Sequence, residues 1–545
     1  MLEGGVFMAP PRRDFNNFGP KFHGDTSVMH DSLKSRTVAS LGYSLACRLI
    51  VFTLSSATAI VLARNLTASD YGIVGLAMIF TGLLAQFSDL GVTASIIQKE
   101  SISEDELYTA FTLKILLGLA IFALSIFLGS VSLGAFDNPA VGAVIVVLAA
   151  NLLIGCLGFI PNAVMTRDLR FKRLTIPQIG SQVTASAVAV ITVYAGFRYW
   201  SIVISNLTAS VASVAILFTL CPVSIKLRWD GQSLKRHVEF GMSLFLSGLM
   251  VFVLFNADNF VIGAVSGAAV LGFYAIAFSW GTKVACFLSS AIHGVLLSAF
   301  SRVQQDTDRL KRGYLTILEY VSFGAVMGNV LLFILSKDLL VLVLGAGTEK
   351  WLPALGALDI LCAYGIVRAV LEPVGSVIIA SGRPDLILKS NAVVAVLQAA
   401  CLYPGLKYFG IAGVAVVVTL SYSLQFLIYL PALRRGMGLH TSAIFRRVFP
   451  SVLSGCVVAA FGFALRRFMV ISWFSMILKL SMGFSLYMLT YATITRGKIL
   501  KDGGEVLCAL LAKTDLPPES TNWMGCAHIT LLRGRKAPFL PKAKI

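Results

Sequence analysis

This sequence has unusually little charge for its length. Only 13% of its 545 residues are Asp, Glu, Lys or Arg, whereas 57% are hydrophobic, and the mean hydropathy is +0.82. A soluble chain of this length needs far more charge to cover its surface. The composition therefore excludes an ordinary soluble domain and directs attention to the membrane.

Motifs that would support enzymatic or metal chemistry are also missing. The sequence has no GxxxxGK[ST] phosphate loop and no HExxH, and its nine cysteines form no CxxC pair. "GAGTEK", Gly345 to Lys350, lacks the phosphate-loop spacing. The longest external connection, 337–353, is too short to hold a catalytic domain. We expect no enzyme, no metal and no cofactor.

Long apolar runs are abundant instead, and each is long enough for a helix of about 20 residues that crosses a bilayer. They predict an all-α integral membrane protein with about 14 transmembrane helices. The predicted spans are 39–62, 72–93, 110–133, 140–160, 176–196, 199–220, 241–263, 269–298, 315–336, 354–380, 391–409, 410–431, 448–468 and 470–494.

The net charge of +18 is explained by topology rather than by nucleic acid. With both termini in the cytoplasm, 33 of the 45 Lys and Arg residues fall on the cytoplasmic side. Only 7 fall on the opposite side, and 5 lie within spans. This asymmetry is the positive-inside rule, so we expect a multi-pass protein with cytoplasmic termini.

One pattern occurs twice. "ARNLTASDYGIVGLA", from Ala63, returns as "IGAVSGAAVLGFYAIA", from Ile262, and each joins two spans through a tight external turn. "SLKSR" recurs as "SLKR", and "YWSI" as "YFGI". The predicted parts are a cytoplasmic segment 1–34, six-helix bundles 35–222 and 235–435, two extra helices in 446–495, and a cytoplasmic tail 496–545.

Each repeat has an even number of spans, so both copies enter the membrane in the same direction. The two bundles should therefore be related by a pseudo-twofold axis along the membrane normal, as in many alternating-access carriers. A channel or a rigid scaffold built from two bundles is the alternative.

The residues themselves carry a resemblance. "LARNLTASDYGIVGLAMIFTGLLAQFSDLGVTASIIQ", "FIPNAVMTRDLRFKRL" and "FNADNFVIGAVSGAAVLGFYAIAFSW" resemble the polysaccharide transporter family. This is the Wzx-type oligosaccharide flippase branch of the multidrug/oligosaccharidyl-lipid/polysaccharide exporter superfamily, and the likeness runs from about residue 33 to 495.

The resemblance implies translocation of undecaprenyl-diphosphate-linked oligosaccharide repeat units across the bacterial inner membrane. That substrate would serve exopolysaccharide, capsule or O-antigen synthesis. Membrane lipid, a polysaccharide polymerase and a chain-length regulator are the partners such a flippase implies. The first 30 residues and the tail after about residue 500 lie outside the resemblance.

Ionisable groups inside spans are costly and usually face protein or a water-filled cavity. Arg48 and Lys283 lie near the middle of their spans, one in each repeat, and we expect both in the cavity. They suit a diphosphate, or each could pair with a nearby acid. Arg368 is a third cavity candidate, which could instead pair with Glu372, four residues on.

Acids and prolines give the remaining candidates. Asp258, Asp359 and Glu372 are candidates for ion coupling or gating, and Asp258 could equally be a polar cap for an external turn. Pro161 and Pro373, at matching places in the repeats, would kink their spans as hinges or as fixed bends.

Two other functions compete with the flippase. A multidrug or cation antiporter of the same superfamily would favour deep acidic residues, whereas the mid-span charges here are mostly basic. An integral enzyme or a passive subunit of a polysaccharide assembly is the third possibility. Short external loops argue against the enzyme, and the duplication argues against the passive subunit.

Overall fold

The structure is a computed structural model that describes residues 26–98, 102–135, 139–167, 171–223, 225–290, 307–380 and 384–497. Within those ranges every regular element is a helix, which confirms the predicted all-α class. The chain divides into two units, Met1–Tyr487 and Met488–Ile545. The described part of the second unit is the end of one helix and the turn after it.

The first predicted bundle contains eight helices in the described residues. They are α1 (Thr26–Asn65), α2 (Ala68–Asp89), α3 (Val92–Gln98), α4 (Glu104–Ala135), α5 (Pro139–Leu157), α6 (Phe159–Arg167), α7 (Phe171–Tyr194) and α8 (Trp200–Leu220).

The remaining described elements are longer on average. They are α9 (Gly231–Gly281), α11 (Thr307–Asp338), the π-helical turn η2 (Leu339–Leu344), the 3₁₀ turn η3 (Leu352–Ala354), α12 (Leu355–Ala380), α13 (Pro384–Met437), α14 (Thr441–Phe468) and α15 (Trp473–Thr495). Residues 283–290 are also helical.

Twelve helices among the described residues are long and apolar enough to cross a membrane. Two of them, α9 and α13, contain a non-helical glycine with positive φ, at Gly267 and Gly410. Glycine adopts that conformation without the strain that a side chain adds. Both glycines lie where the sequence predicted a tight turn between two spans, although the count of fourteen spans stays a prediction.

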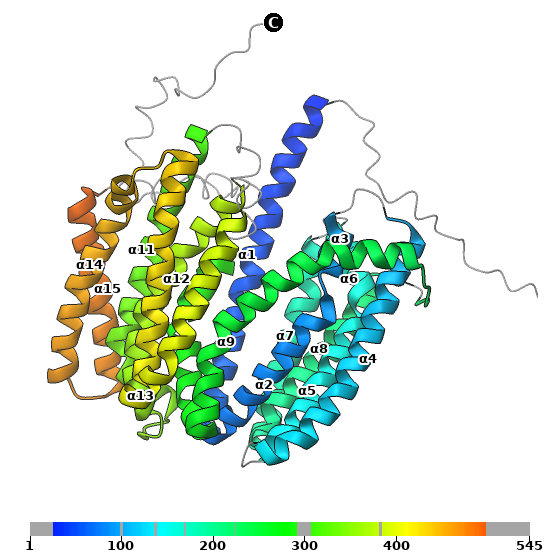
Figure 1. Cartoon of the computed structure of the whole chain (residues 1–545). Helices are drawn as coiled ribbons and strands as arrows, with labels where there is room; N and C mark the ends of the chain where they lie inside the picture. The colour runs from blue at the N-terminus through cyan, green and yellow to red at the C-terminus, as the bar shows by residue number, and fades with distance from the viewer. Residues whose placement is uncertain are drawn as a thin grey trace, which may run out of the picture. The chain divides into compact units, whose positions relative to one another are not determined.

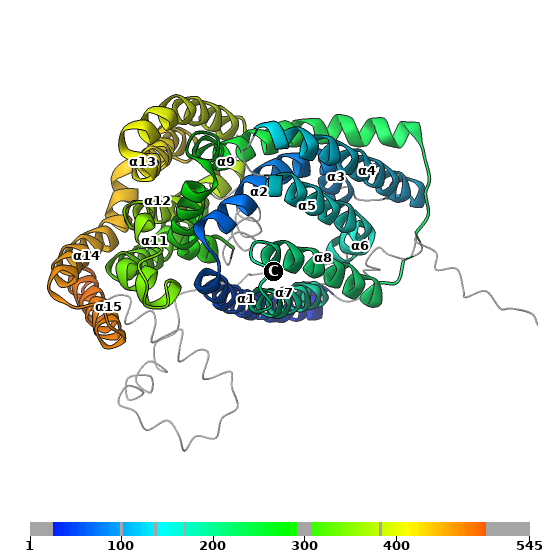
Figure 2. The same cartoon turned by 90° about the horizontal axis from the view of Figure 1, so that it is seen from below.

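Helix packing joins segments that are far apart in the sequence. α2 runs along α9, while α7 packs between α1 and α8 (Figures 1 and 2). α11 contacts both α12 and α14, and α13 contacts α12 and α9. The contact of α2 with α9 joins the two predicted bundles, and it is the main one discussed below.

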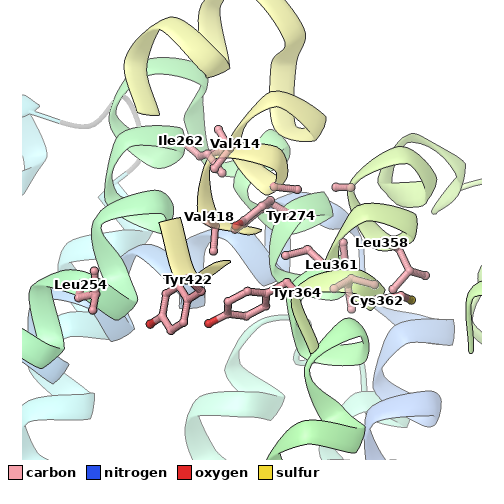
Figure 3. Packing of buried hydrophobic residues seen from close by; sticks show 14 of the residues in the cluster. Leu254, Ile262, Tyr274, Leu358, Leu361, Cys362, Tyr364, Val414, Val418 and Tyr422 are labelled. Carbon is pink, nitrogen blue, oxygen red and sulfur yellow. The ribbon is translucent and has the colours of Figure 1, made fainter. Parts of the chain in front are cut away.

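The buried core is richest around α9, α12 and α13 (Figure 3). The rings of Tyr364 and Tyr422 meet edge to face with centroids 4.9 Å apart. Tyr274 and Phe278 extend the same aromatic group from α9. Aromatic pairs in this geometry add to the stabilisation that burial alone provides, so this region is a rigid part of the protein.

The two matched prolines have different surroundings. α5 ends at Leu157, Gly158 forms a turn, and Pro161 lies in the first turn of α6. Proline is well tolerated there, because the first amide groups of a helix have no partner within it. Pro373 instead lies inside the continuous helix α12. The chain is therefore interrupted near Pro161 but not at Pro373, and the hinge role of both prolines stays a prediction.

Candidate functional site

The short turn after α1 is fixed by local chemistry. Thr67 and Asp70 form a capping box, in which the Thr67 backbone amide donates to the Asp70 carboxylate at 2.9 Å and the Asp70 amide donates to the Thr67 hydroxyl. This arrangement satisfies amide groups that the first turn of α2 leaves open. We call the end of the helices that carries this turn the hairpin end; it is the end predicted to be external.

At the hairpin end α2 and α9 cross with their backbones in contact. A methyl group on Gly72 would lie 1.7 Å from the carbonyl oxygen of Ala268, and one on Gly272 would lie 1.8 Å from that of Ala68. The contact is reciprocal: each helix offers an Ala and, four residues later, a Gly. Small residues spaced in this way let membrane helices approach closely. The crossing joins the two turns in which the sequence pattern repeats.

A second contact at the hairpin end is polar. The Lys350 ammonium donates to the carbonyl oxygen of Arg64 at 2.6 Å, and the Trp351 indole N–H donates to that of Ala63 at 3.0 Å. In return the Arg64 Nε donates to the carbonyl oxygen of Val343 at 2.8 Å. Partial burial lowers the pKa of Lys350 below its usual value. We call this group, Ala63, Arg64, Val343, Lys350 and Trp351, the clasp.

The clasp satisfies carbonyl groups that would otherwise be open. Backbone carbonyls in the last turn of a helix have no partner within it, and cationic side chains are favoured there. Lys350 and Trp351 therefore close the end of α1 from a loop that is distant in sequence. Trp351 is fully buried, and its ring also meets those of Tyr71 and Phe273 edge-on.

The contact of α2 with α9 continues to the opposite end of the helices. Gly82 faces Phe252, the Phe87 and Phe245 rings have centroids 5.0 Å apart, and a methyl group on Gly91 would lie 2.5 Å from Cα of Gly241. We call this continuous contact the α2–α9 seam.

The other seam joins α1 to the helical residues 283–290. The Phe52 and Phe287 rings have centroids 4.9 Å apart there. Arg48 precedes Phe52 by one helical turn, and Lys283 precedes Phe287 by one turn, so both cations lie on the helix faces that carry this contact. We call this contact the α1–283 seam.

The structure thus brings two predicted cavity cations to one seam. At 1.5 Å of rise per residue each lies about 6 Å along its helix from the touching rings. Both side chains are partly exposed, and the Lys283 ammonium lies 4.3 Å from the centroid of the Trp280 ring. A cation above an indole face is attracted by the negative face of the ring.

Arg368, the third predicted cation, lies near the helical residues 283–290 of that seam, because Cys286 is among the groups that interact with it. Its guanidinium lies 4.8 Å from the centroid of the Phe255 ring and is partly exposed. Tyr364 and Tyr422 are its neighbours on α12 and α13. Arg368 therefore adjoins Tyr364 and Tyr422, two of the rings labelled in Figure 3. Glu372 is partly buried on the next turn of α12.

Asp258 is the most buried acid among the predicted coupling residues, with 1% of its surface exposed. Its carboxylate accepts a hydrogen bond from the Tyr274 hydroxyl at 2.7 Å and another from the Asn259 backbone amide at 2.8 Å. Tyr274 lies beyond the kink at Gly267, so this bond ties the two arms of α9 together. A buried carboxylate held by neutral donors is a chemically reasonable proton-binding group.

Asp359 has a charged partner. Arg466 of α14 binds it at 3.0 Å, and the Ser336 hydroxyl donates to it at 2.5 Å. The contact links α11, α12 and α14 in one place. Asp359 therefore holds these helices together, and its role in ion coupling stays a prediction.

One buried charge pair was not anticipated. Lys479 of α15 binds Asp338 at 2.9 Å, with 2% and 0% of the two side chains exposed. Lys479 lies in the predicted span 470–494, whereas Asp338 lies in the predicted connection 337–353, so the sequence shows no partner for either residue. Glu319 likewise pairs with Arg447. Together with Asp359, these pairs fasten α14 and α15 to α11 and α12.

No group of three or more His, Cys, Asp or Glu that could hold a metal ion occurs within the described ranges. The seams present aromatic rings, and the α1–283 seam also presents two cations, while Asp258 is a buried carboxylate on α9.

Comparison with known proteins adds family and fold. The profile of the polysaccharide biosynthesis protein family matches residues 61–355, which contain the crossing, the clasp and all of α9. Lipopolysaccharide biosynthesis protein WzxC of Escherichia coli K12 is 27% identical over 407 residues, 72% of this chain and 79% of that protein. Teichuronic acid biosynthesis protein TuaB of Bacillus subtilis 168 is 26% identical over 388 residues, 69% and 78% of the two chains.

Two solved structures share the fold at low identity. The lipid II flippase MurJ, in an inward closed conformation, has a TM-score of 0.68 at 12% identity, covering 85% of this chain and all of that one. An inward-facing multidrug resistance MATE transporter has a TM-score of 0.55 at 16% identity, covering 74% and 99%. Because the family profile spans more than half of the sequence, and WzxC and TuaB match it over more than two thirds, the chain belongs to the polysaccharide biosynthesis protein family, in its Wzx-type transporter branch.

Proposed function

We propose that the protein is a flippase that moves undecaprenyl-diphosphate-linked oligosaccharide repeat units across the bacterial inner membrane. The observation that carries the proposal is the α1–283 seam, where Arg48 and Lys283 lie on helix faces that meet. A carrier of a lipid-linked diphosphate needs cations that bind the diphosphate. It also needs a lateral opening through which the lipid tail can remain in the bilayer. A seam between two lipid-exposed helices offers both.

The two cations suit different parts of such a ligand. Arg48 offers a planar, forked set of donors that can bind two phosphate oxygens at once, while Lys283 is a compact charge. On antiparallel helices they lie on opposite sides of the Phe52–Phe287 contact, about 12 Å apart along the helix axes. A diphosphate that moves past the aromatic pair would pass from one cation to the other.

The closed hairpin end supports alternating access. The Gly72–Ala268 crossing and the clasp join the two predicted bundles there, on the predicted external side. A carrier that loads from the cytoplasm needs its external end shut in the loading state. Release outside would then require Lys350 and Trp351 to leave the carbonyls of α1. Both predicted termini are cytoplasmic in this scheme.

Ion coupling is the second part of the proposal. Asp258 is fully buried and ties the two arms of α9, so a change in its protonation would alter the bend at Gly267. A buried acid is also what a drug or cation antiporter of this superfamily would use. Asp258→Asn distinguishes the two functions: it should leave slow, gradient-independent flipping in a flippase and abolish exchange in an antiporter.

The test uses proteoliposomes that contain an undecaprenyl-diphosphate-linked oligosaccharide. The readout is the rate at which inner-leaflet sugar becomes accessible to an impermeant oxidant outside. We expect Arg48→Ala combined with Lys283→Ala to lower that rate at least tenfold. Lys389→Ala combined with Arg434→Ala, two exposed cations away from the seam, is the matched control and should flip at the wild-type rate.

The result that overturns the proposal is equally clear. Wild-type protein that exposes no more sugar than empty liposomes, with or without an ion gradient, is not a flippase for this class of lipid. Export of an organic cation against a proton or sodium gradient by the same vesicles would establish the antiporter instead.

A further inference from the structure

The connection between α8 and α9 carries a surface that the flippase mechanism does not use. Residues 225–230 have no regular secondary structure and lie against one face of α4; we call this segment the linker strand. The Arg228 amide donates to the Thr112 hydroxyl at 3.1 Å, and the Asp230 amide donates to the Thr109 hydroxyl at 3.2 Å. Arg228 also pairs with Asp105.

These contacts fix which way each side chain points. Lys226 and Arg228 lie with their charged groups 5.7 and 5.9 Å from the centroid of the Tyr108 ring on α4. Two residues that are two positions apart and lie on one ring indicate extended backbone, in which successive side chains point to opposite sides. The residues that alternate with these cations therefore point away from α4. Those residues are apolar, and they are exposed: Ile225 56%, Leu227 68% and Trp229 57%.

The position of the linker strand along α4, relative to the start of the predicted span, indicates what covers its exposed face. α4 enters its predicted span at Glu104, and α8 leaves its span at Leu220, just before the linker strand. Thr109 and Thr112 therefore lie about 8 to 12 Å along α4 from its first residue, at 1.5 Å per residue. One turn further, Leu116 begins the row of exposed apolar residues by which α4 faces lipid. The exposed apolar residues of the linker strand therefore lie within about two helical turns of that row along α4.

We propose that the linker strand is a phospholipid anchor, with Ile225, Leu227 and Trp229 inserted at the boundary between headgroups and acyl chains. That boundary is where amphipathic segments lie, and where tryptophan is enriched in membrane proteins. On the predicted topology the leaflet is the cytoplasmic one. Lys226, held on Tyr108, keeps a positive charge at the same level, near anionic headgroups, while Arg228 is paired with Asp105.

The anchor has a consequence for the whole carrier. The linker strand is the covalent link between the two predicted bundles, and its hydrogen bonds fasten it to the first of them. If its outer face is held in the leaflet, α9 begins from a point fixed in the bilayer, and the second bundle moves relative to that point. This inference requires a membrane protein and does not depend on the flippase proposal.

The test is fluorescence of the full-length protein in liposomes whose phosphatidylcholine carries bromine on acyl carbons 6 and 7. Bromine quenches tryptophans that contact those carbons. We expect wild type to lose more fluorescence than Trp229→Phe, and the difference to shrink when bromine is moved to carbons 11 and 12. Trp351→Phe is the matched control: Trp351 is fully buried, so its removal should leave the quenched amplitude unchanged.

Water-soluble iodide completes the experiment. Equal loss by wild type and Trp229→Phe in the brominated lipids, together with iodide quenching of Trp229, overturns the proposal and shows a face open to water. Equal loss without iodide quenching overturns it too, because the face is then covered by protein. Phenylalanine keeps the ring in place, so the comparison does not depend on a variant that fails to fold.

Discussion

The two seams that join the predicted bundles differ, although a duplication should make them alike. The α2–α9 seam brings backbone against backbone, with Gly72 and Gly272 at one end and Gly91 and Gly241 at the other. In the α1–283 seam the contact is between two aromatic rings, Phe52 and Phe287. Phe87 and Phe245 form a comparable ring pair in the glycine-rich seam, at 5.0 Å against 4.9 Å.

The difference indicates which seam opens. Even a small separation of two helices packed on glycine is costly, because many close backbone contacts are lost at once. Rings on flexible side chains can swing aside while their helices stay in place. The α1–283 seam also carries Arg48 and Lys283. A lipid-linked substrate would therefore enter through that seam, while the α2–α9 seam acts as the pivot.

The largest effect should come from locking one seam at a time. Phe52→Cys with Phe287→Cys, cross-linked by a short bifunctional thiol reagent, should stop sugar exposure almost completely. Phe87→Cys with Phe245→Cys, cross-linked in the same way, should retain most of the wild-type rate. The ring separations are nearly equal, so the pairs differ chiefly in which seam they lock. The measurement is the rate of sugar exposure before and after reduction of the cross-link.

Native cysteines set the control for that experiment. The chain has several, so unsubstituted protein treated with the reagent gives the background rate, and mass spectrometry of the peptides confirms each intended link. Inhibition by both cross-links would contradict a single opening seam and indicate that the whole end opens as a unit.

Much of this architecture was predictable because the bilayer simplifies the problem. A membrane span must be a long apolar helix, so the spans could be read from hydropathy, and the recurring turn before Gly72 and before Gly272 pointed to equivalent places. The tight turn predicted near residue 410 is the kink at Gly410. These features depend on local sequence alone.

Partnerships between distant residues were not predictable. Asp338 was predicted to lie outside its span, and nothing local to it indicates Lys479, which lies in another helix. The clasp depends on Trp351 reaching a backbone carbonyl of α1, a group present at every residue and therefore without a sequence signal. Likewise, Arg48 and Lys283 were predicted as cavity residues, but their shared seam required the packing of α1 against residues 283–290.

An intermediate effect is expected from the pivot itself. In Gly72→Ala the new methyl group would lie 1.7 Å from a backbone oxygen, which cannot move unless α2 and α9 separate. Overpacking of this kind costs about 1–3 kcal/mol. We expect a lower thermal midpoint in detergent. We also expect the flipping rate to fall by roughly an order of magnitude, because a free energy of that size added to the transport barrier slows the rate by about that factor.

The same helix provides the control for the pivot. A methyl group on Gly75 would lie 3.4 Å from the Leu271 side chain, an ordinary contact. Gly75→Ala should therefore behave as wild type in both measurements. A loss in Gly75→Ala as large as that in Gly72→Ala would show that α2 needs flexible glycines rather than a close crossing.

The smallest effect on transport should come from the pair that holds α15, because Lys479 and Asp338 lie in neither seam. Lys479→Met leaves Asp338 buried without its cation, which costs about 3–5 kcal/mol of stability, whereas Lys479→Met with Asp338→Leu removes both charges and should recover most of it. The yield of folded protein and its thermal midpoint measure that recovery.

The flipping rate per folded molecule should stay near wild type in the double variant, since α14 and α15 lie outside the predicted repeat and both seams remain intact. A double variant that folds well but flips slowly would place this charge pair in the transport cycle, and the distinction between moving seams and a static attachment would then have to include α15.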